Sequence, residues 1–142
     1  MNILIMGCGR VGSSLASSFS QKGHTVIILD INSTAFQRLP ADFKGTAIVG
    51  NGTDQDTLTG ANVNDTDVFL ALTQGDNRNL MAAQIAKHIF KVPRVLSRVY
   101  DKNRADIFAK LGIETFSSTY IMSNMIEDIV INPETNEEKS NL

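Results

Sequence analysis

The sequence is short of the residues that build covalent or metal-bonded frameworks. It contains one cysteine, Cys8, two histidines and no tryptophan. A single cysteine cannot form a disulfide within the chain, and neither His24 nor His88 has a companion at the spacing of a metal site. No serine, histidine and aspartate are arranged as a nucleophilic triad. We therefore expect no metal, no catalytic residue and a reducing compartment.

Strong charge and long apolar runs are also missing. The formal net charge is −2, which gives no long-range attraction to nucleic acid or to anionic lipid. No apolar run is long enough to cross a bilayer, and the first residues lack the layout of a signal peptide. These features favour a cytoplasmic protein that neither binds nucleic acid nor inserts into the membrane.

Apolar segments of strand length alternate with segments of helix length along the 142 residues. The predicted strands are 3–6, 26–29, 47–49, 68–72, 95–99 and 115–116, and the predicted helices between them are 11–22, 32–39, 54–60, 76–90 and 103–111. Several strands are continuously apolar, as in a sheet that is covered on both faces. The pattern predicts an α/β fold of the Rossmann type, with a doubly wound parallel sheet in one domain over residues 1–131.

Polar residues and glycines mark the predicted helix ends. Thr53 or Asp54 is placed to cap one helix and Asp76 another, because a side-chain oxygen can accept from the free N–H groups of a first turn. Gly23 and Gly112 lie just past two helices, where a left-handed backbone favours glycine.

The end of the chain changes character. Segment 118–130 carries a narrow apolar stripe, formed by Ile121, Met122, Met125, Ile126, Ile129 and Val130. Two interpretations stay open: a last helix that covers the sheet, or a helix that crosses to a partner subunit or a further domain. Residues 132–142 are polar, and we expect them to be disordered.

The clearest chemical motif is a glycine loop that follows the first strand and opens the first helix: Gly7, Cys8, Gly9, Arg10, Val11 and Gly12. Gly7 allows a tight turn, Gly9 lets the backbone approach a diphosphate, and Gly12 permits close packing of helix and strand. Asp30 ends the second strand, roughly 20 residues on, where a carboxylate accepts hydrogen bonds from ribose and repels a 2′-phosphate. The motif predicts an adenine nucleotide site that disfavours NADP; the alternative is a tight turn without a ligand.

Further candidates lie at the other strand ends, because ligands of open α/β sheets bind beyond the carboxyl ends of the strands. Arg10 is placed to reach a terminal phosphate. The remaining candidates are Ile31, Asn51, Gly52, Thr53, Thr73 and Arg98. For the polar residues after the third and fourth strands, turn and cap chemistry is an equally simple interpretation. Cys8 is interpreted as a small side chain that fits the turn, rather than as a redox thiol.

Arg98 needs an explanation of its own. An arginine that ends an apolar strand should have an anionic partner, since burial of an unpaired charge is costly. The partner is either a phosphate or a carboxylate such as Asp101.

Two further stretches are more particular than the glycine loop: Thr73-x-x-Asp76-x-x-Asn79-Leu80 and Arg104-Ala105-x-Ile107-Phe108-x-x-Leu111-Gly112. Together with the glycine loop and segments 26–30 and 50–54, they make residues 1–129 resemble the RCK or KTN family. This family comprises the TrkA-N type nucleotide-binding domains of potassium channel and transporter regulators.

The resemblance implies a regulatory module rather than an enzyme. Such domains bind NAD(H), ATP, ADP or AMP, and form dimers or larger rings beneath a membrane-embedded potassium channel or transporter. By this resemblance the glycine loop with Arg10 holds phosphates and Asp30 holds the ribose. Residues 51–53 and Thr73 would lie by the adenine, and Arg98 is a weaker candidate for a phosphate contact. The last helix would cross to the neighbouring subunit.

Two departures from the family pattern stand out. Asn51 replaces the aspartate that the family usually has, which puts any contact of that carboxylate in question. The chain also ends soon after the crossover helix, so we expect either a minimal one-domain regulator or a fragment without a C-terminal subdomain. A fragment of an NAD-dependent oxidoreductase and a stand-alone sensor of NADH and NAD are the alternative functions.

Overall fold

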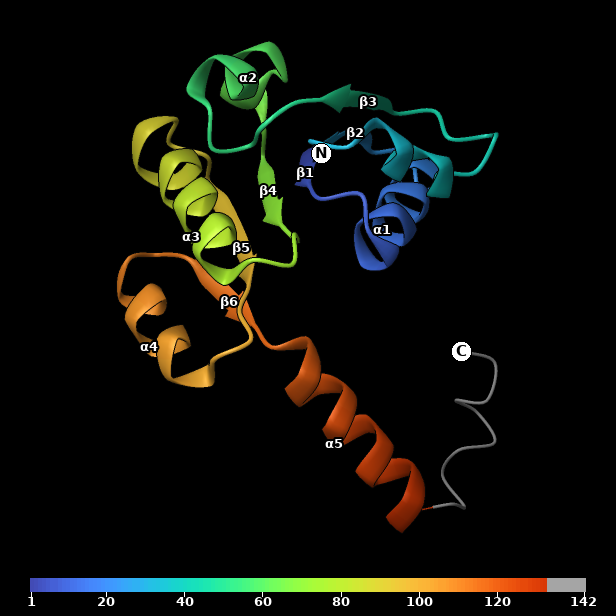
Figure 1. Ribbon diagram of the computed structural model, residues 1–142, viewed down its shortest axis with the longest axis vertical. Coiled ribbons are helices and arrows are strands. Elements are labelled where there is room, and N and C mark those ends of the chain that lie inside the picture. Colours follow the sequence, from blue (N-terminus) through green and yellow to red (C-terminus); the bar gives the residue numbers. More distant parts are fainter. Residues whose placement is uncertain (133–142) are drawn as a thin grey trace.

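A single sheet of six parallel strands organises the molecule (Figure 1). The computed structural model describes residues 1–132, so the predicted disordered tail lies almost wholly outside the described residues. The strands are β1 (Asn2–Met6), β2 (Thr25–Asp30), β3 (Thr46–Val49), β4 (Val68–Ala71), β5 (Arg94–Arg98) and β6 (Glu114–Phe116). Their order is β3-β2-β1-β4-β5-β6, which confirms the predicted doubly wound sheet. The winding direction reverses between β1 and β4, where such sheets bind ligands.

Within residues 1–132, five α-helices connect or follow the strands: α1 (Arg10–Gln21), α2 (Gln55–Gly60), α3 (Asp76–Gln84), α4 (Lys102–Lys110) and α5 (Ser118–Ile131). Two predicted helices differ in type. Segment 32–39 contains a 3-10 helix, η1 (Ser33–Arg38), because the Asn32 side chain closes a tight turn at its start and Pro40 follows its end. Segment 76–90 continues from α3 into a π-helical turn, η3 (Ile85–Ile89), and a further 3-10 turn, η2 (Val63–Asp65), precedes β4.

The four inner strands, β1, β2, β4 and β5, bury side chains on both faces, as their apolar sequences predict. Alternate residues of β1 enter separate cores: Ile3 and Ile5 pack with α1 and η1, and Leu4 and Met6 pack with α2 and α3. In Figure 1, α1 accordingly lies on the opposite side of the sheet from α2 and α3. Both faces around β1 and β4 are therefore closely packed, and the loops at the carboxyl ends of these strands start from this packed body.

The observed helix ends confirm most of the predicted caps and helix-ending glycines. Gly23 and Gly112 have positive φ values of 85° and 76°. Asp54 caps α2, accepting from the backbone N–H of Thr57 at 2.9 Å and from its hydroxyl at 2.7 Å. These hydrogen bonds lower the pKa of Asp54. The prediction for Asp76 is wrong: Gly75 is the N-cap of α3 and makes no side-chain cap bond.

Helix α5 does not cover the sheet. It leaves the body of the molecule after β6 and extends away from it (Figure 1), and none of its residues is buried. The six residues of the apolar stripe are 45–72% exposed. The interpretation of α5 as a covering helix is therefore wrong for this chain.

Two glycines fix how α1 leaves β1. Gly7 has φ of 108°, a conformation that favours glycine. A Cβ added at Gly12 would collide with the carbonyl oxygen of Gly7, so no side chain fits there. The backbone thus has the tight turn expected at Gly7 and the close packing of helix and strand expected at Gly12.

We predict that Gly12→Ala destabilises the fold by about 1–3 kcal/mol, because the backbone must shift to admit one methyl group. The control is Gly60→Ala at the end of α2, where an added Cβ meets nothing within 4 Å; its effect should stay below about 1 kcal/mol. Urea unfolding followed by circular dichroism measures both. Equal stability of the two variants would contradict the close contact.

Candidate functional site

The glycine loop presents open backbone at the carboxyl end of β1. Its first residue is tied to the next strand, since Gly7 N–H donates to the Leu29 carbonyl at 2.8 Å. Gly9 is exposed, and an added Cβ would meet nothing within 4 Å. The absence of a side chain at Gly9 therefore serves no internal packing, and it leaves space in which an outside group can approach the backbone.

The N-termini of α1 and α3 lack side-chain caps. The other three α-helices are capped by the side chains of Asp54, Asp101 and Ser117. Helix α1 follows β1 and α3 follows β4, so the two uncapped ends flank the point where the winding reverses. Free N–H groups and the helix dipole favour an anion at such ends.

Asp30 joins the loops after β1 and β2. Its carboxylate accepts from Cys8 N–H at 2.8 Å and from Asn32 N–H at 2.9 Å. A carboxylate has about four lone-pair positions, so it keeps capacity for the two hydroxyls of a ribose. Ile31, next in sequence, is 58% exposed and offers an apolar surface beside it.

Residues 51–53 form a compact turn. The Asn51 side-chain oxygen accepts from Thr53 N–H at 3.0 Å and from its hydroxyl at 2.8 Å. Gly52 is buried against Met6, whose side chain leaves no room for a Cβ. The turn chemistry that the sequence offered as one interpretation is therefore present. Thr53 uses its hydroxyl proton within the turn and can only accept from a further group.

Arg10 and Val11 lie exposed on the first turn of α1. Arg10 is within 4.0 Å of no carboxylate among residues 1–132, so its guanidinium is available at the uncapped helix end. This placement agrees with the phosphate role that the sequence predicts for it.

Thr73 lies against the glycine loop on the β4 side. An added Cβ at Gly7 would be 3.0 Å from Thr73 N. The fully buried Asn79 holds Thr73: its oxygen accepts from Thr73 N–H at 2.9 Å and from the hydroxyl at 2.7 Å, and its Nδ2 donates to the Thr73 carbonyl at 2.9 Å. Because Thr73 spends its hydroxyl proton on Asn79, it can accept from a ligand but cannot donate to a phosphate.

Arg98 is the last residue of β5, and its side chain reaches Thr73, which follows β4. Its guanidinium donates to the Thr73 carbonyl at 2.6 Å and lies 5.0 Å from the centroid of the Tyr100 ring. Its Nε is buried without a hydrogen-bond partner in the described part of the chain. Asp101 is not its partner, since this carboxylate pairs with Arg104 at 3.7 Å. The carboxylate alternative is thus excluded for Asp101, and the partners that the guanidinium has in the described part of the chain are the Thr73 carbonyl and the Tyr100 ring.

Two further residues, Asn79 and Asp76, shape the site through contacts that sequence reasoning did not predict. Asn79 also donates from Nδ2 to the Arg98 carbonyl at 3.2 Å. Asp76, predicted as a cap, instead accepts from Tyr100 N–H at 2.9 and 3.0 Å with its two oxygens. The available signal was the particular spacing Thr73-x-x-Asp76-x-x-Asn79, which places both residues on one side of a helix start.

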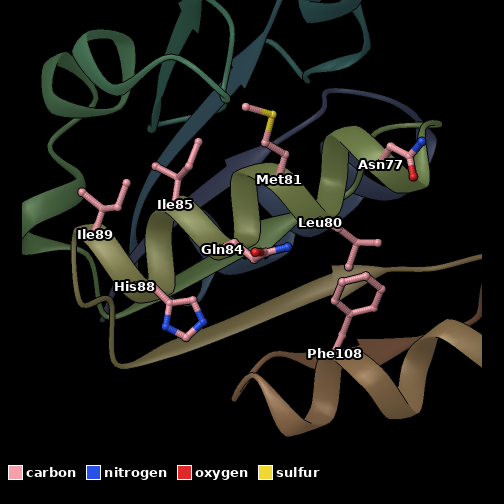
Figure 2. A pocket seen from close by; sticks show the side chains of 8 residues that line it. All are labelled: Asn77, Leu80, Met81, Gln84, Ile85, His88, Ile89 and Phe108. Atoms are coloured by element: carbon pink, nitrogen blue, oxygen red, sulfur yellow. The ribbon is translucent and has the colours of Figure 1, made fainter.

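A separate hollow of about 470 Å³ lies between the outer side of α3 and α4 (Figure 2). Phe108 of α4 reaches toward Leu80 of α3 across it, and none of its lining residues is among the predicted site residues. Among residues 1–132, no three His, Cys, Asp or Glu side chains are grouped to hold a metal ion. No helix in that range is long and apolar enough to span a bilayer.

Comparisons with known proteins agree with this architecture. The family model of the TrkA-N domain matches residues 3–119. The chain is 46% identical over 118 residues to the Trk system potassium uptake protein TrkA of Streptomyces coelicolor, covering 83% of this chain and 53% of that protein. It thus spans about half the length of this relative.

Solved structures share the fold, among them two that are described with a bound nucleotide. The Kef CTD of Shewanella denitrificans in its AMP-bound form has a TM-score of 0.75 at 20% identity, covering 92% of this chain and 81% of that one. The GsuK channel bound to NAD has a TM-score of 0.76 at 20% identity, covering 94% of this chain and 24% of that one.

Cys8 is packed into the site as a small apolar side chain. It is fully buried, and burial, followed by the nearby Asp30 charge, raises the pKa of its thiol. A raised pKa means a smaller thiolate fraction at any given pH. We predict that iodoacetamide at pH 8 alkylates the native chain more than about tenfold slower than the urea-unfolded chain. Mass spectrometry follows the one thiol, and equal rates would contradict this packing.

Proposed function

The chain belongs to the TrkA-N domain family, and on that basis we propose that it is a regulatory domain that binds an adenine nucleotide and controls potassium transport. The observation that carries the proposal is the uncapped start of α1 beside Asp30, at the reversal point between β1 and β4. This arrangement offers backbone donors for phosphate and a carboxylate for ribose at the same end of the sheet.

The position of each group follows from the strand order. Asp30 at the end of β2 would hold the ribose of the adenosine, with Ile31 and residues 51–53 beside the base. The glycine loop at the end of β1 would hold the first phosphates. Groups beyond these phosphates would then extend toward β4 and β5, where Thr73 and Arg98 lie.

Hydrogen-bond capacity limits what two of these residues recognise. Thr53 and Thr73 both donate their hydroxyl protons within the protein. Each can therefore accept from a ligand donor, such as an amino group of a base or a sugar hydroxyl, but neither can donate to a phosphate oxygen. Phosphate recognition is left to the backbone of residues 7–12, to Arg10 and to Arg98.

The known proteins supply the biological setting. The Streptomyces coelicolor relative is a Trk system potassium uptake protein, and two proteins of the same fold are described in complex with AMP and with NAD. By analogy the ligand of this chain is NAD(H), ATP, ADP or AMP. Its partner is a membrane-embedded potassium channel or transporter subunit, beneath which the domain acts at the cytoplasmic face as a dimer or a larger ring.

Regulation would follow from differential affinity. A nucleotide shifts an assembly only by as much as it prefers one conformation over the other. A role in sensing rather than catalysis is supported by the relative of this chain, which is a Trk system potassium uptake protein.

We predict that the purified chain binds adenine nucleotides and that Gly9→Ala weakens this binding at least about tenfold. The new methyl group would occupy the space in which a diphosphate approaches the loop, although it meets nothing within 4 Å in the protein. Isothermal titration with NADH, NAD, ATP, ADP and AMP measures the effect, with Gly60→Ala as the control. A folded wild-type chain that binds none of the five would overturn the proposed function.

We further predict that Arg10→Ala reduces affinity for ATP by about three- to tenfold, the size expected of an exposed charge-assisted contact. Affinity for AMP should change by less than about twofold, because AMP lacks the terminal phosphates that Arg10 would reach. Lys22→Ala, just past the other end of α1, removes the same charge as a control. Equal losses for ATP and AMP would show that Arg10 does not sense the terminal phosphate.

A further inference from the structure

The ends of β4 and β5 are held together by side chains rather than by the sheet. The ladder between these strands ends at the pair Ala71 and Ser97. Beyond this pair, Asn79 bridges the segments that end the two strands, since its Nδ2 donates to the carbonyls of Thr73 and Arg98. One fully buried amide thus replaces the next step of the ladder.

Asp76 fastens the following residues in the same way. Its carboxylate accepts from Tyr100 N–H at 2.9 Å and from Asp101 N–H at 3.4 Å. Asp76 and Asn79 lie one turn apart on α3, and together they fix the backbone from Arg98 to Asp101. We call these two residues the α3 clasp.

The α3 clasp determines where the Arg98 guanidinium lies. The guanidinium is bound on one side to the Thr73 carbonyl, which Asn79 holds, and on the other it rests over Tyr100, whose backbone Asp76 holds. Its buried Nε has no partner in the described part of the chain. A half-buried cation that is fixed from both sides is preorganised for an anion that approaches its accessible side.

We propose that Asn79 and Asp76 are positioning residues that hold Arg98 for the part of the nucleotide beyond its first phosphate, and so set the preference for ATP over AMP. The proposal rests on the proposed function, because it requires a nucleotide at the glycine loop. Neither clasp residue touches the nucleotide. The single phosphate of AMP would lie at the β1 loop, whereas the further phosphates of ATP would extend toward β4 and β5, where Arg98 lies.

The test is a double-mutant cycle between the clasp and Arg98, measured by isothermal titration with ATP and with AMP. Arg98→Ala should lower ATP affinity about tenfold and leave AMP affinity within about twofold. Asn79→Ala should show the same selective loss. The double variant should bind ATP no more weakly than either single variant, because Asn79 acts through Arg98.

Asn79→Ala removes a buried side chain with several hydrogen bonds, so a second variant covers the case in which it does not fold. Asp76→Ala leaves the contacts of Asn79 in place and should show a smaller loss of the same kind, confined to ATP. Thr66→Val is the control for a general loss of stability: Thr66 is also buried and donates to the Asn62 carbonyl, but it precedes β4 at the opposite edge of the sheet. Its ratio of ATP to AMP affinity should equal that of the wild type.

The outcomes separate the two proposals. If the wild-type chain binds ATP and AMP but the clasp variants lose affinity for both equally, or their losses multiply with that of Arg98→Ala, the positioning role is overturned and nucleotide binding stands. If the folded wild-type chain binds neither nucleotide, the proposed function fails, and the positioning role fails with it.

Discussion

The near contact between the Gly7 carbonyl oxygen and Gly12 is the constraint on which the rest of the site depends. It brings α1 against β1 so closely that no side chain fits between them. The first turn of α1 is thereby aimed at the carboxyl edge of the sheet, and its N–H groups stay free because Gly9 carries no capping oxygen. Asp30 then fixes the same loop from the β2 side through Cys8 N–H. Tight packing on the inside and an open backbone on the outside are two consequences of the same three glycines.

The site is built symmetrically about the reversal between β1 and β4, although the two halves use different chemistry. On the β2 side a carboxylate, Asp30, holds the backbone of two loops. On the β5 side an amide and a carboxylate, Asn79 and Asp76, do the same. In each half the polar side chains are spent mainly on fixing loops, which keeps the surface that faces a ligand rigid and largely made of backbone. Such preorganisation reduces the ordering that binding would otherwise require.

Much of this could be read from the sequence, for identifiable reasons. The apolar strand segments, the glycine loop and Asp30 can each be recognised from a short stretch of sequence. The ends of the strands lie within one residue of the predicted ranges. The bridging functions of Asp76 and Asn79 could not be predicted, because the bonds that join them to the end of β5 and to the residues after it span 19 to 25 residues of sequence. A cap and a cross-strand clasp need the same residue type at the same helix start. The direction of α5 could not be predicted either, because apolar residues at helical spacing indicate an apolar face of a helix but not which surface that face packs against.

Helix α5 begins directly after β6, and its first turn is held near the site edge, where the Lys102 ammonium lies 4.5 Å from the centroid of the Tyr120 ring. Its 14 residues extend about 21 Å at the rise of an α-helix. A tilt of about 10° at the N-terminal end of a helix of this length moves its C-terminal end by roughly 4 Å. A tilt at the root of α5 that leaves every strand pairing intact would therefore move the tip of the helix by about the width of a methyl group.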